Sequence, residues 1–79
     1  MSTPAVTRLV EGHRDFLGFL ERRLGDRALA EDVLQDAFVR GVPRADAIGA
    51  DAVVAWFYQV LRNAIVDVAR RRGASTDAL

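Results

Sequence analysis

Apolar side chains recur three or four positions apart along almost the whole chain, which is the spacing that gathers them on one face of an α-helix. No segment alternates between apolar and polar residues with a period of two, so we predict no β-sheet. The chain is therefore predicted to be all-α. In the first segment, the residues with helical spacing are Val6, Leu9, Val10, His13, Phe16, Leu17, Leu20 and Leu24.

Three helices are predicted, over residues 4–24, 27–40 and 52–72, with an irregular connection over residues 41–50. Three main helices with short connections are typical of a small three- to four-helix bundle. Residues that cap or stop helices support these boundaries. They are Thr3 as N-cap before Pro4, Gly25 after the first helix, Asp26 as N-cap of the second, Gly41 and Pro43 after it, Asp51 as N-cap of the third, and Gly73 after it.

The length of 79 residues is enough for one domain. We assign residues 1–73 to that domain and residues 74–79 to a tail or the start of an interdomain linker. With no cysteine and a single histidine, we expect no disulfide, metal or other cofactor. No apolar run approaches the roughly 20 residues that span a bilayer, and the N-terminus lacks the regions of a signal peptide. These features predict a cytoplasmic protein without membrane insertion.

Charge is balanced overall but unevenly distributed. All eleven basic residues are arginine, and eleven acidic residues cancel them. Residues 31–36 carry three acids and no base, whereas residues 62–72 carry four arginines against Asp67 alone. Such a polarised chain suggests two partners of opposite charge.

The second predicted helix has an apolar face and an acidic face. The acidic face can be a solvated surface, in which Asp36 pairs with Arg40 four residues later. It can also be a docking surface for a basic partner, but for an isolated helix the solvated surface is the favoured interpretation. The apolar face comprises Leu29, Ala30, Val33, Leu34, Ala37 and Phe38, and the acidic face comprises Glu31, Asp32, Gln35 and Asp36.

The third predicted helix places a polar row beside a complete core face. Indole rings stack on bases, amides hydrogen-bond base edges and arginines neutralise phosphates, so this row suits nucleic acid. Packing of Trp56 and a helix-dipole role for the last arginines explain it equally well. The core face is Phe57, Val60, Leu61, Ala64, Ile65 and Val68, and the row is Trp56, Gln59, Asn63 and Arg70 with Arg62 beside it.

Catalytic chemistry has almost no support in this sequence. His13 lies within an apolar face, so we expect a buried or interhelical histidine. Glu31 and Asp32 are neighbours and point apart on a helix, and Asp67 is expected to pair with Arg70 or its neighbour Arg71. No glycine-rich phosphate loop is present, and we predict that the chain is not an enzyme.

Two motifs in order resemble region 2 of the sigma-70 family, in particular the extracytoplasmic-function group of bacterial sigma factors. They are "AEDVLQDAFVR" at 30–40 and "AWFYQVLRNAIVDVARRR" at 55–72. The family shows an A-E-D-x-x-Q-[DE]-x-F helix, a variable loop, and a W-[LF]-Y-x-[IV]-x-R-N-x-x-x-D-x-x-R helix. Each motif alone is weak, but both at this spacing are specific, and they cover roughly residues 6–72.

The resemblance implies a transcription initiation factor domain with two binding surfaces. The second helix would dock on the clamp coiled coil of the RNA polymerase β′ subunit, and loop and third helix would bind and melt the promoter −10 element, capturing the non-template strand. An anti-sigma factor is a further expected partner. The implied polymerase-binding residues are Asp32, Gln35 and Asp36, with Glu31 peripheral and Arg40 also included. The implied DNA-binding residues are Arg44, Trp56, Gln59, Arg62, Asn63, Arg70 and Arg71.

The chain departs from the family pattern in three ways. Gln59 stands where relatives often carry a basic residue, and the loop has Arg44 but no aromatic residue to stack on a flipped base. Base capture in the loop would therefore use backbone groups and small side chains, and of the two roles open to Trp56, support of the loop and contact with DNA, we expect the first. The family's second, −35-reading domain is absent, so the sequence is either an isolated domain of a longer factor, which we expect, or a naturally short protein.

An alternative function is a non-initiating, sigma-like module that acts as a decoy for polymerase or an anti-sigma factor. In that case the acidic helix would remain functional while the loop and the polar row would not. A plain helix-turn-helix is disfavoured, because about ten residues between the second and third helices exceed its usual turn.

Overall fold

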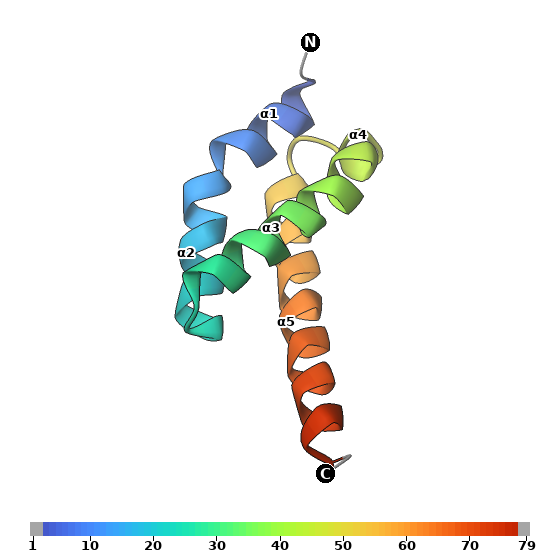
Figure 1. Ribbon diagram of the computed structural model, residues 1–79. Coiled ribbons are helices and arrows are strands. Elements are labelled where there is room, and N and C mark those ends of the chain that lie inside the picture. Colours follow the sequence, from blue (N-terminus) through green and yellow to red (C-terminus); the bar gives the residue numbers. More distant parts are fainter. Residues whose placement is uncertain (1–2, 78–79) are drawn as a thin grey trace.

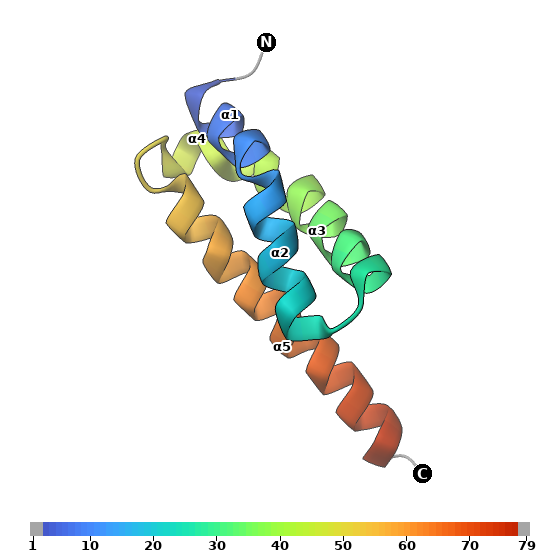
Figure 2. The same cartoon turned by 90° about the vertical axis from the view of Figure 1, so that its left-hand side faces the viewer.

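The computed structural model describes the backbone of residues 3–77 and the side chains of residues 3–73. Within the described range the chain is helical, with no β-strand, as predicted (Figure 1). Two long helices, α3 and α5, pack with α2 into a bundle, and α1 and α4 lie together at one end (Figure 2). The elements are α1 (Pro4–Glu11), α2 (His13–Leu24), α3 (Arg27–Gly41), the 3-10 turn η1 (Val42–Arg44), α4 (Ala45–Ile48) and α5 (Val53–Asp77).

The first predicted helix is two helices, so its unbroken span was wrong. Its start is confirmed, because Thr3 Oγ1 accepts a hydrogen bond from the Val6 amide at 3.2 Å. The break falls at Gly12, which separates α1 from α2. A Cβ at Gly12 would lie 2.8 Å from Cζ of Phe16, so the glycine lets that ring pack against the backbone. The break allows α1 to contact α4 and α5.

The second predicted helix agrees closely with α3. Asp26 Oδ1 accepts from the Leu29 amide at 3.0 Å, which is the predicted N-cap. The stop before it is also confirmed, because Gly25 adopts a left-handed φ of 69° and its amide donates to the Glu21 carbonyl at 2.8 Å. These two local signals make the tight α2–α3 connection.

The connection over residues 41–50 is more regular than predicted. It contains η1 and α4, and Gly49 at a φ of 93° ends α4. Gly41 is the last residue of α3, so the predicted end is confirmed within one residue, and a Cβ there would lie 2.9 Å from Cε1 of Phe57. Its role is therefore close packing of α3 on α5.

The third predicted helix begins later and extends further than expected. The Gly49 carbonyl accepts from the amides of Ala52 and Val53, so a turn precedes α5 and Asp51 lies before its N-cap position. Gly73 does not end the helix, since a glycine inside a helix costs only about 1 kcal/mol. The predicted tail at 74–79 continues α5 as far as Asp77, and residues 78–79 lie outside the described part of the chain.

Aromatic rings from three helices form the centre of the core. Phe16 of α2 lies 4.8 Å from Phe57 and 5.1 Å from Tyr58, both on α5, measured between ring centroids. Phe38 of α3 lies 5.1 Å from Phe57. Phe16, Leu34, Phe57 and Leu61 are fully buried, which confirms the centre of the predicted core faces, whereas Val10, also predicted to lie on the first of these faces, is 59% exposed.

His13 is an exception to the predicted core. It is exposed rather than buried, and its ring stacks on Phe38 with centroids 5.8 Å apart and an interplanar angle of 6°. Of the two expected alternatives, buried or interhelical, the second is therefore confirmed. His13 is the first residue of α2, and its side chain reaches the edge of α3.

No helix within the described residues is both long enough and apolar enough to cross a membrane.

Substitution of alanine for two glycines should change stability in opposite directions. Gly12→Ala should destabilise the fold by about 1–3 kcal/mol, because the new Cβ meets the buried Phe16 ring. Gly73→Ala should stabilise it by about 0.5–1 kcal/mol, because nothing lies within 4 Å of a Cβ there and alanine favours the helix. Chemical denaturation of both variants measures the difference, and stabilisation by both would contradict the proposed packing role of Gly12.

Candidate functional site

The acidic face of α3 is separated from its buried face. Ala30, Leu34 and Ala37 are buried in the core. On the opposite side the predicted polymerase-binding side chains are all exposed, namely Glu31, Asp32, Gln35, Asp36 and Arg40. This face therefore contributes little to the core and is available to a partner.

Two of these acids already have arginine partners within the chain. Asp36 Oδ2 lies 3.2 Å from Arg40 Nε, which is the predicted pair four residues apart. Glu31 Oε1 lies 3.1 Å from Arg27 Nε. Both pairs are largely exposed, so each is expected to contribute only a few tenths of a kcal/mol to stability.

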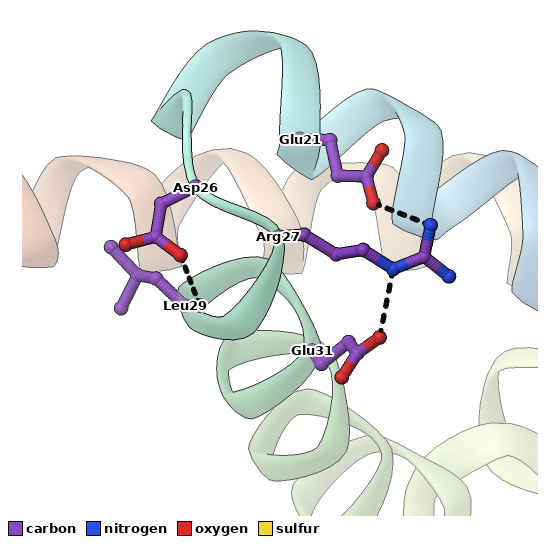
Figure 3. A network of polar contacts seen from close by, with 5 residues as sticks. All are labelled: Glu21, Asp26, Arg27, Leu29 and Glu31. Atoms are coloured by element: carbon purple, nitrogen blue, oxygen red, sulfur yellow. Dashed lines mark hydrogen bonds and ion pairs between the residues drawn. The ribbon is translucent and has the colours of Figure 1, made fainter.

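Arg27 also connects two helices. Its Nη1 lies 3.4 Å from Glu21 Oε1 of α2, so the guanidinium lies between a carboxylate of α2 and one of α3 (Figure 3). That oxygen of Glu21 is buried and accepts no hydrogen bond, so its contact with Arg27 is purely an ion pair. The network holds the start of α3 against the end of α2.

Asp32 and Gln35 differ from their neighbours. Among the side chains that the structure describes, neither forms a hydrogen bond or an ion pair. They lie three residues apart on α3 and are exposed. A charged acceptor and a primary amide are thus presented together to solvent.

A groove of about 300 Å³ separates α3 from α5, and it brings the two predicted surfaces together. Arg71, predicted to bind DNA, lines it together with Asp32 and Asp36, predicted to bind polymerase. Asp67 also lines this groove but forms no ion pair with Arg70 or Arg71, so its predicted pairing was wrong. The full lining is Leu29, Asp32, Val33, Asp36, Arg40, Ala64, Asp67, Val68 and Arg71.

A smaller adjoining groove of about 160 Å³ continues toward Asn63. It shares Asp36, Arg40 and Asp67 with the larger groove. A ligand at Asn63 and a partner on α3 would therefore lie next to each other. The periodicity of each helix taken alone does not predict this proximity.

Trp56 is half-buried and packs against the core at the start of α5. The guanidinium of Arg44 lies 6.0 Å from the centre of its ring, within the range of a cation–π contact. Its Cη2 also lies 3.6 Å from the position of a Cβ on Gly41. The indole therefore supports the end of α3 and the η1 turn, and it holds Arg44 near α5.

Gln59 and Asn63 are exposed on α5 and hydrogen-bonded to one another. Gln59 Nε2 donates to Asn63 Oδ1 at 3.2 Å. Among the described residues, the amide nitrogen of Asn63 and the carbonyl oxygen of Gln59 have no such partner, so the pair presents one donor group and one acceptor. This pre-formed pair lies on the same helix as Trp56, which places it in the predicted row.

The predicted DNA-binding arginines do not lie together. Arg62 lies on the α2 side of α5, with its guanidinium 5.9 Å from the ring centre of Phe19. Arg70 is exposed about two turns beyond Asn63, and Arg71 faces the α3 groove. The structure thus brings Arg44, Trp56, Gln59 and Asn63 to one end of α5 and distributes the remaining arginines over other flanks.

Arg23 is a further basic residue near Phe19, where α2 packs against α5, and it lies outside both sequence motifs. Its guanidinium lies 3.9 Å from the ring centre of Phe19. The spacing of four residues between Phe19 and Arg23 on one helix is the sequence signal that could have revealed the contact. The described residues contain no group of three histidines or carboxylates placed to hold a metal ion.

Comparison with known proteins agrees with this geometry. The family model "Sigma-70 region 2" matches residues 9–75, and the chain therefore belongs to the sigma-70 region 2 family, with the extracytoplasmic-function type as its group. It is similar to the ECF RNA polymerase sigma factor SigM of Bacillus subtilis (strain 168), with 37% identity over 57 residues. The alignment covers 72% of this chain and 35% of that relative, so the chain spans about a third of the relative's length. No solved structure matches the chain.

Removal of the arginine that bridges α2 and α3 should reduce stability more than removal of a surface arginine. Arg27→Ala leaves the buried Glu21 oxygen without its counter-charge, and we expect a loss of about 1 kcal/mol. Arg40→Ala breaks only an exposed pair and should cost a few tenths of a kcal/mol.

A double-mutant cycle measured by chemical denaturation checks the cause. In a Glu21→Gln background the cost of Arg27→Ala should fall, because the unpaired charge is already absent. An unchanged cost would show that the bridge does not stabilise the helix junction.

Proposed function

We propose that this chain is the region 2 domain of a sigma factor that acts in transcription initiation. It would dock on the β′ clamp coiled coil of RNA polymerase through α3 and recognise and melt the promoter −10 element through η1, α4 and α5. It is a binding domain rather than an enzyme. The observation that carries the proposal is the exposed acidic face of α3, on which Asp32 and Gln35 have no partner among the side chains of residues 3–73, beside the polar pair on α5.

Docking on a basic helix follows from the state of each acidic side chain. Asp32 can accept charge-assisted hydrogen bonds without first breaking a pair, and Gln35 can both donate and accept. Asp36 and Glu31 must exchange their own arginines for those of the partner, so their net contribution is smaller. This supports a central role for Asp32 and Gln35 and a peripheral one for Glu31.

DNA melting needs differential binding rather than an energy source. Extraction of a base from the stack costs a few kcal/mol, which contacts made only to the opened strand must return. A protein that binds the opened form more tightly shifts the equilibrium toward it without hydrolysis. Here the ordered η1–α4 segment, with Arg44 held at Trp56, supports capture on a pre-formed surface, and the Gln59–Asn63 pair supports contacts to base edges or backbone.

Loss of the two unpaired side chains on α3 should weaken polymerase binding. We expect the double variant Asp32→Ala, Gln35→Ala to bind isolated β′ clamp helices at least about tenfold more weakly, because two central contacts disappear. The matched control is Asp46→Ala, which removes an exposed acid from α4 instead. Binding by calorimetry or pull-down measures the effect, and wild-type affinity of the double variant would show that the docking surface is elsewhere.

Loss of Asn63 should weaken binding to the opened promoter strand. We expect Asn63→Ala to reduce affinity for a single-stranded −10 non-template oligonucleotide about five- to tenfold, the equivalent of about one hydrogen bond. Gln35→Ala, which truncates an amide on α3, is the matched control and should bind as wild type. Fluorescence anisotropy at several salt concentrations provides the measurement.

The same experiment separates initiation from the alternative decoy function. A decoy would bind the clamp helices but show no salt-dependent binding to the oligonucleotide. Binding to the strand that is insensitive to Asn63 would leave the initiation role intact and show that the polar row does not make the contact.

A further inference from the structure

Two guanidinium groups from different helices converge on the ring of Phe19. Arg23 of α2 places its Cζ 3.9 Å from the ring centre, and Arg62 of α5 places its Cζ 5.9 Å from the same centre. The ring is only 7% exposed, whereas both arginines are exposed. The two cations therefore lie at the surface, over the seam where α2 packs against α5.

Like most arginines of the described residues, these two have no acidic partner, and what distinguishes them is that both lie near the same aromatic ring. Arg27 and Arg40 each pair with a carboxylate. Among the described side chains, no carboxylate lies within ion-pair distance of Arg23 or Arg62, and their only interactions are those with Phe19. Two positive charges near one ring repel each other, and a cation–π contact does not neutralise either charge.

The chemistry of this pair fits one kind of ligand. Each guanidinium carries planar, paired donors that match the oxygens of a phosphate, and two of them can approach one phosphate from two sides. A carboxylate has fewer oxygens to share between two such groups. An anion with several oxygens would also remove the repulsion between the two arginines.

The position of the pair indicates where that phosphate comes from. Arg62 immediately precedes Asn63 on α5, and successive helical residues are about 100° apart, so the two side chains lie on neighbouring flanks of one exposed ridge. A strand that contacts Asn63 and crosses α5 would reach the α2 side within about one helix diameter of 10 Å. The phosphodiester backbone of that strand is the nearest source of phosphate.

We propose that Arg23 and Arg62 together hold one backbone phosphate of the nucleic-acid strand that α5 binds. The inference depends on the DNA-binding half of the proposed function and extends its surface from α5 onto α2. Arg23 thereby becomes a binding residue outside both sequence motifs, and Arg62 acts with α2 rather than with Trp56.

The salt dependence of binding tests this assignment. Fluorescence anisotropy of a labelled single-stranded oligonucleotide, titrated with the 79-residue chain at several salt concentrations, gives the slope of log affinity against log salt. We expect the double variant Arg23→Ala, Arg62→Ala to reduce the magnitude of this slope by about 0.7, the value for one phosphate of a single strand. Each single variant should bind about tenfold more weakly.

Arg22→Ala provides a control of equal charge. Arg22 adjoins Arg23, but its Nη1 lies 3.5 Å from the position of a Cβ on Gly18, one turn back along α2. This variant should retain the wild-type slope. Arg23→Gln keeps a long side chain over Phe19 without the charge, and it should lose affinity while its thermal denaturation midpoint stays close to wild type.

The possible outcomes distinguish failure of the phosphate site from failure of the proposed DNA-binding function. An unchanged slope in the double variant, with binding still weakened by Asn63→Ala, would overturn the phosphate site alone. A reduction near 1.4 would overturn the shared phosphate in favour of two separate ones. If the wild-type chain binds no oligonucleotide, the DNA-binding half of the proposed function falls together with this inference.

Discussion

The packing of Phe16, a residue of α2, against α3 and α5 is the contact on which the rest of the molecule depends. Its ring is fully buried and touches aromatic rings of both α3 and α5. It also requires Gly12, which breaks the first helical segment and allows α1 to reach α4 and α5. One side chain thus sets the distances among the three main helices and, through them, the grooves between α3 and α5.

The aromatic core contacts only one face of α3, so charged side chains occupy the opposite face. The acids on α3 and the arginines on α5 lie on adjacent helices, and the α3–α5 groove puts Asp32 and Asp36 beside Arg71. In a chain of zero net charge, the acidic face of α3 therefore borders Arg71, while Arg62 lies on the α2 side of α5.

Local signals predicted most of the fold, and non-local contacts account for the errors. Asp26 and Gly25 act through their own hydrogen bonds, so the ends of α2 and α3 could be read directly. The break at Gly12 was missed and the role of Gly41 in packing was not predicted, because both depend on an aromatic ring, Phe16 or Phe57, that lies against the glycine. The order within 41–50 likewise depends on packing, since Ala45 is buried against other elements. Periodicity carries no information about which ring will approach a glycine.

The same distinction holds for the candidate site. Exposure of the acidic face of α3 and the Asp36–Arg40 pair follow from spacing along one helix. The approach of Arg62 to the ring of Phe19, near which Arg23 also lies, depends on how α2 packs on α5. A helical projection describes how the residues of one helix are placed around its axis, whereas a binding surface combines residues from several helices.

The continuity of α5 has a geometrical consequence. This helix runs unbroken for 25 residues, from the buried end of the bundle past Gly73, and Figure 1 shows its far end projecting beyond the other helices. Along a rigid helix, angular position is counted in residues, so a single insertion between Asn63 and Arg70 would turn all that follows by about 100° and advance it by about 1.5 Å. The direction in which the terminal arginines point is therefore a matter of register, set by the aromatic core several turns away.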